Sequence, residues 1–456
     1  MPILFFPLAS AFTLLLLNRA LGRMLPGLYT ARFFGMYYLF QAGLVAVILV
    51  LEPETMLWND AYPLTLAEAT PRLCGCFLLE GLVGFGLSWL LRKPLKRFTT
   101  HLPPLTERIR QSRYPLDSYL ALLAVLLLLN LFANVEGLVF YFIRTTLDLT
   151  FVAAFVAGVR FRQTRRFVQI LWGLALAGAA TRAVFAGSRS DFLPVLLYGW
   201  GVFLSLPTRR ARMVALVAVA ALLPSFVVLN SFIGSYRLQQ GRLNNLGDIS
   251  AERVSAALSA RDQLAVGQRT PLQMVLERLL NHPNAAVVAL TPDVIPYRGW
   301  GNLGTEVADN FVVTGLRGQA AIEGVREAWR EQEFGLGTAN SYGFYSGLKS
   351  GVEFSILADG YSRAGAFGVL LYGILAVLLL LGAEVLLLRK APAASADGVL
   401  LLTFLLYVAL GVFYAYPFFW TVKFLVLRTL GYFLVTRLYR YSVGALTATE
   451  PGTLRL

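Results

Sequence analysis

Cysteine and histidine are scarce in this chain, which has two of each among 456 residues. Cys74 and Cys76 are separated by one residue within an apolar run, so neither a disulfide framework nor a tetrahedral metal site is indicated. The sequence also lacks a phosphate-binding Gly-Lys-Ser/Thr loop and a paired His-Glu metal helix. It has no Asp-x-Asp motif in its long polar segment, residues 233–363. We therefore expect no metal and no cofactor, and these absences disfavour an ATP-driven pump, a metalloprotease and a metal-dependent transferase.

Charge is also sparse, since charged residues make up 14% of the chain and hydrophobic residues 57%, with a mean hydropathy of +0.63. A soluble globular protein of this size is rarely so apolar, and most apolar runs of the sequence are close to the length that a helix needs to cross a bilayer. The N-terminal run lacks a basic start and a cleavage site, so we expect it to be retained as a first helix. We predict an all-α polytopic membrane protein with about 11 transmembrane helices, at 2–18, 33–51, 73–91, 118–134, 137–159, 167–186, 192–206, 213–232, 364–388, 398–416 and 419–438.

The net charge of +14 lies mainly in short loops between the apolar runs. Basic loops alternate with acidic or neutral loops, which is typical of retention on the cytoplasmic side and needs no nucleic acid as a partner. Membrane lipids are the expected partner of the remaining positive charge. This pattern predicts an N-terminus outside, a C-terminus inside and three parts: 1–232 with helices 1–8, an extracytoplasmic loop with short helices at 233–363, and 364–456 with helices 9–11 and a cytoplasmic tail.

Arginines near the outer ends of the expected spans are the first candidate site residues. Arg189 lies in the short segment that connects the expected helices six and seven, and Arg182 lies within helix six, further from its outer end. A guanidinium forks onto two phosphate oxygens, so these arginines predict a diphosphate site facing outward, although they can also extend to lipid headgroups. Lys423 and Arg428 lie in the last expected helix without an acidic partner in that helix.

Two acid–arginine pairs have the i, i+4 spacing of neighbours on one helix face. Arg144 and Asp148 are expected to neutralise each other within helix five. Asp359 and Arg363 come where the long loop returns to the membrane, after Glu353, and we expect this second pair to be exposed to an outer cavity and to have a role in function.

Several of these stretches together resemble the Wzy-type polysaccharide polymerases, which include the O-antigen and enterobacterial common antigen polymerases. The stretch Ala186-Gly187-Ser188-Arg189-Ser190-Asp191 resembles their Gly-Gly/Ser-Thr/Ser-Arg motif, and the similarity of pattern extends over 170–435. Four further stretches follow in a similar order: Leu276-Glu277-Arg278, Leu336-Gly337-Thr338-Ala339-Asn340, the return to the membrane through Asp359-Gly360 and Ala364-Gly365-Ala366-Phe367-Gly368, and Lys423 to Arg428.

The resemblance implies a GT-C-like, metal-independent, inverting glycosyltransferase in the bacterial inner membrane, with its active site facing the periplasm. Such an enzyme joins undecaprenyl-diphosphate-linked oligosaccharide repeat units, and a chain-length-regulating co-polymerase is a partner expected from the family. The diphosphate would be held by Arg189 and Arg278, with Arg428, Lys423 and Arg182 as supporting cations.

The catalytic base is left open among three residues. Asp359 and Glu353 lie near the return to the membrane, and His282 follows Arg278 in a stretch similar to the outer loop of the related O-antigen ligases. Sugar contacts are expected from Asn340, Tyr342 and Tyr345, and Tyr297 and Trp300 share this chemistry, although aromatic residues also form belts at the membrane interface.

Two other functions remain as alternatives. An O-antigen ligase would perform the same transfer onto a lipid A core, and the sequence does not separate the two acceptors. A flippase or transporter for lipid-linked sugars would need charged residues along a path through the bilayer. The charge identified above lies at the outer ends of the helices, which favours chemistry on the outer face.

Overall fold

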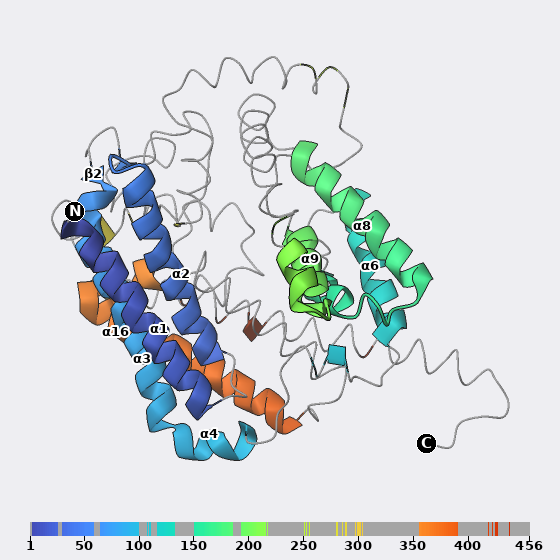
Figure 1. Cartoon of the computed structure of the whole chain (residues 1–456). Helices are drawn as coiled ribbons and strands as arrows, with labels where there is room; N and C mark the ends of the chain where they lie inside the picture. The colour runs from blue at the N-terminus through green and yellow to red at the C-terminus, as the bar shows by residue number, and fades with distance from the viewer. Residues whose placement is uncertain are drawn as a thin grey trace. The chain divides into compact units, whose positions relative to one another are not determined.

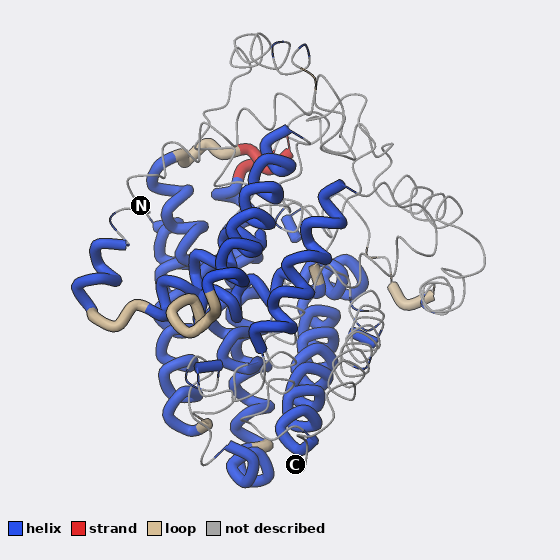
Figure 2. The backbone as a smooth tube through the Cα atoms, turned by 90° about the vertical axis from the view of Figure 1, so that its right-hand side faces the viewer, coloured by secondary structure: helices blue, strands red, loops and turns tan. Residues whose placement is uncertain are grey.

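The computed structural model describes residues 2–25, 30–58, 64–99, 116–132, 150–185, 193–215 and 355–390, together with single residues and short pieces elsewhere. These residues are mostly helical (Figure 2), and the strands among them are one short hairpin. By internal contacts the chain forms two units, described separately below: unit 1 is Met1–Leu102, Gly267–Arg389 and Leu405–Lys423, and unit 2 is Pro103–Val266, Lys390–Phe404 and Phe424–Leu456.

Unit 1 begins with three helices that pack against one another, α1 (Phe5–Met24), α2 (Thr30–Leu51) and α3 (Leu66–Leu90). A 3-10 turn at Pro2–Leu4 precedes α1, and the antiparallel strands β1 (Met56–Trp58) and β2 (Leu64–Thr65) connect α2 to α3. The basic helix α4 (Arg92–Thr99) follows α3, and the long helix α16 (Ile356–Lys390) belongs to the same unit (Figure 1).

Small residues on α3 allow close packing in this bundle. A Cβ atom added to Gly84 would lie 3.3 Å from Cδ1 of Phe34 on α2, and Gly81 is similarly closed by Leu14 on α1. Glycine at a helix interface removes the side chain that would keep the two backbones apart. The start of α3 is fixed by a capping box, in which Thr65 and Glu68 each accept a hydrogen bond from the other's backbone N–H.

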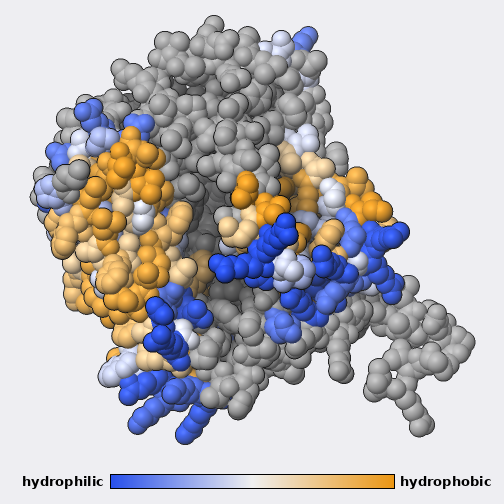
Figure 3. All heavy atoms as spheres, in the orientation of Figure 1, coloured by the Kyte–Doolittle hydropathy of each residue, from blue (hydrophilic) through white to orange (hydrophobic). Residues whose placement is uncertain are grey.

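The exposed surface of the helices of unit 1 is apolar. Phe12 on α1 is 63% exposed and Phe40 on α2 is 52% exposed, and Figure 3 shows an orange apolar band over this unit with blue polar residues at its ends. Because water would disfavour so many exposed apolar groups, this surface suits contact with lipid. Four helices among the described residues are long and apolar enough to cross a membrane, Pro2–Met24, Arg32–Leu51, Leu66–Leu90 and Ile356–Val385.

Unit 2 contains α6 (Leu116–Phe132), a helix over Thr150–Val159, α8 (Arg166–Phe185) and α9 (Leu193–Ser205). Helices α6 and α8 pack together, and Gly158 meets Gly201 of α9 so closely that a Cβ on Gly201 would lie 2.8 Å from the backbone nitrogen of Val159. Arginines satisfy free carbonyls nearby: Nη2 of Arg110 donates to the Leu204 carbonyl, 3.0 Å away, at the end of α9.

The described helices compare with the expected spans as follows. Expected spans at 2–18, 33–51, 73–91, 118–134, 167–186 and 192–206 overlap α1, α2, α3, α6, α8 and α9, and the described part of 137–159 is the helix Thr150–Val159. The expected spans 213–232, 398–416 and 419–438 lie almost entirely outside the described residues. The mostly helical character is confirmed, with four described apolar helices of transmembrane length, whereas the number of spans and the GT-C-like arrangement stay predictions.

The start of α16 lies close to the boundary expected from the sequence. Helix α16 begins at Ile356 but is interrupted at Ala364 and Gly365, so residues 356–363 form a short helix at the end of the expected loop, and the long helix follows from near residue 364. The polar residues Asp359, Ser362 and Arg363 gave this stretch a loop-like composition, but they are buried within unit 1 and make contacts there. Tertiary contacts therefore stabilise a helical turn that hydropathy alone did not indicate.

Candidate functional site at the start of helix α16

Helix α16 is interrupted near its beginning. Ala364 has φ −154° and ψ 31°, and Gly365 has φ 59° and ψ −138°, which are not helical values. A Cβ added to Gly360 would lie 2.6 Å from the carbonyl oxygen of Gly368, whereas in a straight helix these positions are separated by about 12 Å along the axis. The chain therefore bends sharply, and its first turns pack back against the part that follows.

Glycine is required at three positions of this bend. Gly365 has a positive φ, which L residues rarely adopt, and a Cβ there would also lie 2.6 Å from the hydroxyl of Tyr297. Gly360 and Gly368 let the two backbones touch. All three glycines belong to the stretch in which the sequence resembles the polymerases, so that stretch specifies a particular backbone path.

Asp359 and Arg363 form a buried ion pair just before the bend. Their Oδ1 and Nε atoms are 3.5 Å apart, and the side chains are 3% and 0% exposed. Oδ2 of Asp359 also accepts a hydrogen bond of 3.3 Å from the backbone N–H of Phe418. The expectation that this pair faces an outer cavity was wrong, because protein groups surround both side chains and the carboxylate is committed to contacts within unit 1.

The guanidinium of Arg363 joins this bend to the segment of residues 299–301 in the long polar segment. Its Nη1 donates to the carbonyl of Gly299 (3.2 Å), and the N–H of Gly299 donates to the carbonyl of Arg363 (3.1 Å). Gly299 has a φ of 66°, which favours glycine. Because the two residues exchange two hydrogen bonds, both the position and the direction of this loop segment are set by α16.

Aromatic rings enclose the ion pair. The Cζ atom of Arg363 lies 5.6 Å from the ring centroid of Trp300 and 5.7 Å from that of Tyr372. Trp300 meets Tyr372 edge-on at 5.7 Å, and Tyr372 stacks on Phe418 at 5.3 Å. These faces provide cation–π contacts that compensate in part for the lost hydration of the guanidinium. In this structure Trp300 therefore packs on Arg363, while Tyr297 keeps 43% of its surface exposed.

A second buried polar position of unit 1 was missed by sequence reasoning. Glu80 on α3 is 0% exposed, and among the described residues neither of its carboxylate oxygens has a hydrogen-bond partner. A Cβ on Gly373 of α16 would lie 2.9 Å from Cδ of Glu80, so the carboxyl group rests against the α16 backbone. Glu80 is the only charged residue between Leu73 and Leu91. An isolated charge within an apolar run is itself a signal of a functional candidate.

Glu384 near the end of α16 was also missed. It is 0% exposed, like Glu80, but it interacts with another group of the protein. Its signal in the sequence was the same, since it is the only acidic residue within the expected span 364–388.

The sequence-predicted site residues are only partly described. Asp359 belongs to unit 1, and Arg182, in the last turn of α8, belongs to unit 2, where it is half-buried and has an interaction. The remaining candidates lie outside the described residues: Glu353, His282, Arg189, Arg278, Arg428, Lys423, Asn340, Tyr342 and Tyr345, together with the pair Arg144 and Asp148. Their roles stay predictions.

Within the described residues, no three His, Cys, Asp or Glu side chains are grouped so that they could hold a metal ion. Comparisons with protein families, with curated proteins and with solved structures gave no significant match. The fold is therefore described from this structure alone. The protein is mostly helical and has apolar helices of transmembrane length, and one bent helix holds a buried ion pair against a polar loop.

Proposed function

We propose that this chain is a polysaccharide polymerase that joins undecaprenyl-diphosphate-linked oligosaccharide repeat units at the outer face of the bacterial inner membrane. The observation that carries the proposal is the bend in α16. The residues that give the resemblance there, Gly360, Gly365 and Gly368, are the residues whose missing side chains permit the bend. A shared motif with such a stereochemical reason is stronger support than similarity of composition.

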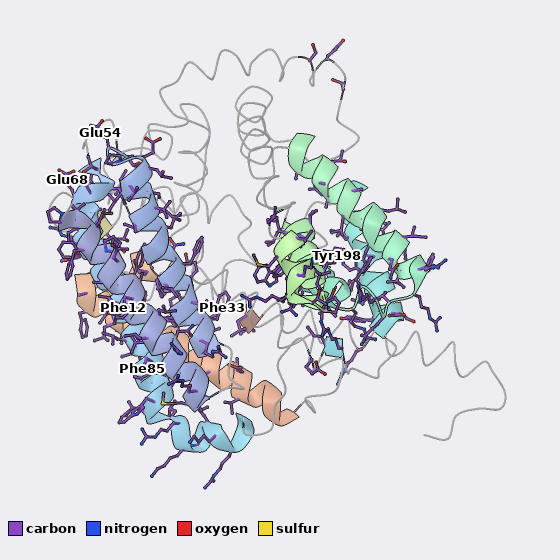
Figure 4. All side chains as sticks on the ribbon, viewed as in Figure 1. Phe12, Phe33, Glu54, Glu68, Phe85 and Tyr198 are labelled. Carbon is purple, nitrogen blue, oxygen red and sulfur yellow. The ribbon has the colours of Figure 1, made fainter. Side chains whose placement is uncertain are left out.

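The proposed orientation is supported by the charges at the two ends of the α1–α3 bundle. Glu54 and Glu68 lie at one end (Figure 4), and α4 lies at the other with its exposed Lys93, Lys96 and Arg97. Near the acidic end, Nη1 of Arg72 donates a 3.1 Å hydrogen bond to the carbonyl of Ala289, which belongs to the long polar segment. Because basic ends are retained in the cytoplasm, this arrangement supports a periplasmic location for that segment.

The proposed reaction is an inverting glycosyl transfer. The oxygen of an acceptor sugar hydroxyl attacks the anomeric carbon of the donor, the bond from that carbon to the diphosphate oxygen breaks, and the hydroxyl proton passes to a base. Arg189 and Arg278 stabilise the departing lipid diphosphate, with Arg182, Arg428 and Lys423 in support. The carboxylate of Asp359 is held by Arg363 and Phe418. We therefore assign Asp359 to positioning, with Glu353 and His282 as the candidate bases.

The test is an assay of the purified protein in liposomes with synthetic undecaprenyl-diphosphate oligosaccharide, run with and without EDTA. Wild type should produce a ladder of longer lipid-linked glycans that survives EDTA, and Arg189→Ala should abolish it. Arg162→Ala is the matched control, because Arg162 is exposed and lies in a loop expected on the cytoplasmic side. Loss of the ladder with EDTA would contradict the metal-independent mechanism, and an equal loss in both variants would contradict the role of Arg189. Transfer that occurs only onto a lipid A core acceptor would indicate the ligase.

Transport of a lipid-linked sugar is the second candidate, and one observation favours it. Glu80 and Glu384 are fully buried carboxyl groups within apolar helices, as a path for a polar group through the bilayer would require. Movement of a fluorescent lipid-linked sugar between leaflets of the same liposomes, without extension of the glycan, would support transport over polymerisation.

A further inference from the structure

Unit 1 carries a concentration of positive charge at one end. The C-terminal part of α1, the beginning of α2 and the corner between α3 and α4 contribute seven basic residues, Arg19, Arg23, Arg32, Arg92, Lys93, Lys96 and Arg97. The described segments 15–25, 30–40 and 85–99, which form this end, contain no acidic residue. We call these seven residues the basic end. Figure 3 shows its polar surface in blue below the apolar band.

Part of the basic end brings like charges close together. The guanidinium of Arg32 lies against α1, where a Cβ on Gly22 would be 3.2 Å from Cζ of Arg32. Gly22 is between Arg19 and Arg23, which are four residues apart and so share one helix face. Like charges gathered in this way repel one another, and a bound anion would lower that repulsion.

Helix α4 has the form of a helix that lies in a membrane interface. It follows directly after the transmembrane-length helix α3 and runs across its direction (Figure 1). Leu95 is buried against the protein, whereas Lys93, Lys96 and Arg97 are exposed. An apolar side turned inward and a basic side turned outward is typical of helices at the headgroup level.

Trp89 and Arg92 indicate the depth of this corner. The Cζ atom of Arg92 lies 4.5 Å from the ring centroid of Trp89, and Trp89 is 45% exposed. Tryptophan is enriched at the boundary between hydrocarbon and headgroups. The cation–π contact therefore holds a guanidinium at the level where lipid phosphates lie.

We propose that the basic end is a binding site for the headgroups of anionic phospholipids, centred on the corner between α3 and α4. Its chemistry suits a phosphodiester: several exposed cations bind the phosphate oxygens, and the apolar band beside them contacts the acyl chains. This site is independent of the proposed polymerase activity, because it uses none of the residues assigned to that reaction.

The test uses purified full-length protein in a neutral detergent, to which phosphatidylglycerol or phosphatidylcholine is added in equal amounts. Thermal unfolding is followed as lipid is titrated. Phosphatidylglycerol should raise the unfolding temperature at lower concentrations than phosphatidylcholine, and high salt should reduce the difference. Soluble glycerophosphate tests whether the headgroup binds without its acyl chains, and it should have little effect on the unfolding temperature.

Two triple variants with the same loss of charge locate the site. Lys93→Gln/Lys96→Gln/Arg97→Gln should weaken the phosphatidylglycerol effect at least about tenfold, since each cation near an anionic surface is worth roughly fivefold in affinity. Arg162→Gln/Arg209→Gln/Arg210→Gln, from exposed residues of unit 2, should leave it nearly unchanged. An equal loss in both variants would mean that stabilisation by phosphatidylglycerol depends only on the net charge of the protein, and would overturn the proposed site. So would an equal response to phosphatidylcholine, or a full response to glycerophosphate.

A second measurement remains informative if a variant unfolds in detergent. Nanodiscs formed from equal parts of the two lipids can be recovered with bound protein, and the lipids retained after delipidation counted by mass spectrometry. Wild type and the unit 2 variant should retain an excess of phosphatidylglycerol, and the variant at the α3–α4 corner should not. No excess in wild type would overturn the proposal.

Discussion

Arg363 and Gly299 exchange two hydrogen bonds, one from the Arg363 guanidinium to the Gly299 carbonyl and one from the Gly299 N–H to the Arg363 carbonyl. These residues are far apart in sequence, and one belongs to the bent helix α16 while the other belongs to the long polar segment. The same guanidinium pairs with Asp359 and faces Trp300. A single buried side chain thus connects the loop, the helix and the aromatic cluster.

Removing the Arg363 charge should destabilise unit 1 strongly. Arg363→Met leaves the Asp359 carboxylate buried without its cation, and loss of one partner of a buried pair costs about 3–5 kcal/mol. The double variant Asp359→Asn/Arg363→Met should be less destabilised than the single one. Thermal unfolding of the four proteins of this cycle measures the coupling, and purely additive effects would show that the two side chains do not interact.

Substitution of Gly365 should be unfavourable for two separable reasons. Gly365→Ala places a Cβ at a φ of 59° and within 2.6 Å of the Tyr297 hydroxyl. With its ψ of −138°, this backbone conformation is largely restricted to glycine, and it costs an alanine about 1–3 kcal/mol by itself. Adding Tyr297→Phe removes the hydroxyl contact and should restore only the steric part. Gly301→Ala, where the added Cβ would meet no described atom within 4 Å, is the control and should unfold as wild type does.

The buried carboxyl of Glu80 should be replaceable by an amide. Glu80→Gln retains the size of the side chain and removes an ionisable group from a site where no described residue forms a hydrogen bond with either oxygen, so the unfolding temperature should be unchanged or higher. Glu384→Gln is the matched control, since Glu384 is equally buried but interacts with another group, and it should be destabilised by about 1–3 kcal/mol. A marked loss of stability in Glu80→Gln would instead mean that a cation holds the Glu80 carboxylate.

Two glycines of α9, Gly199 and Gly201, offer a test of helix packing in unit 2. Gly201→Ala adds a Cβ that would lie 2.8 Å from the Val159 nitrogen, so the two helix backbones must separate. Overpacking of this kind costs about 1–3 kcal/mol. Gly199→Ala, in the same helix but with no described atom within 4 Å of its Cβ, should slightly stabilise the protein. Equal unfolding temperatures for the two variants would contradict the close approach of Gly158 and Gly201.

The sequence predicted the apolar helices because hydropathy over a span depends on composition and hardly on neighbours. The described spans near the N-terminus overlap the expected ones, and the i, i+4 spacing of Asp359 and Arg363 correctly indicated neighbouring side chains. The candidate site was less accessible to prediction. Its residues Gly299, Trp300, Arg363 and Phe418 come from separate stretches, and no local pattern indicates that they meet.

The amino-acid sequence by itself thus determined the chemical class of this protein, a chain too apolar for water, with helices long enough for a bilayer and basic residues gathered at one end of them. Tertiary structure decided what the polar residues do. The Asp359–Arg363 pair is buried in it, although the position of this pair in the chain suggested exposure. The tertiary structure also places Glu80 against Gly373. The physical reason is that solvation of a side chain depends on which distant segments pack around it, whereas helix formation in an apolar run depends on the run itself.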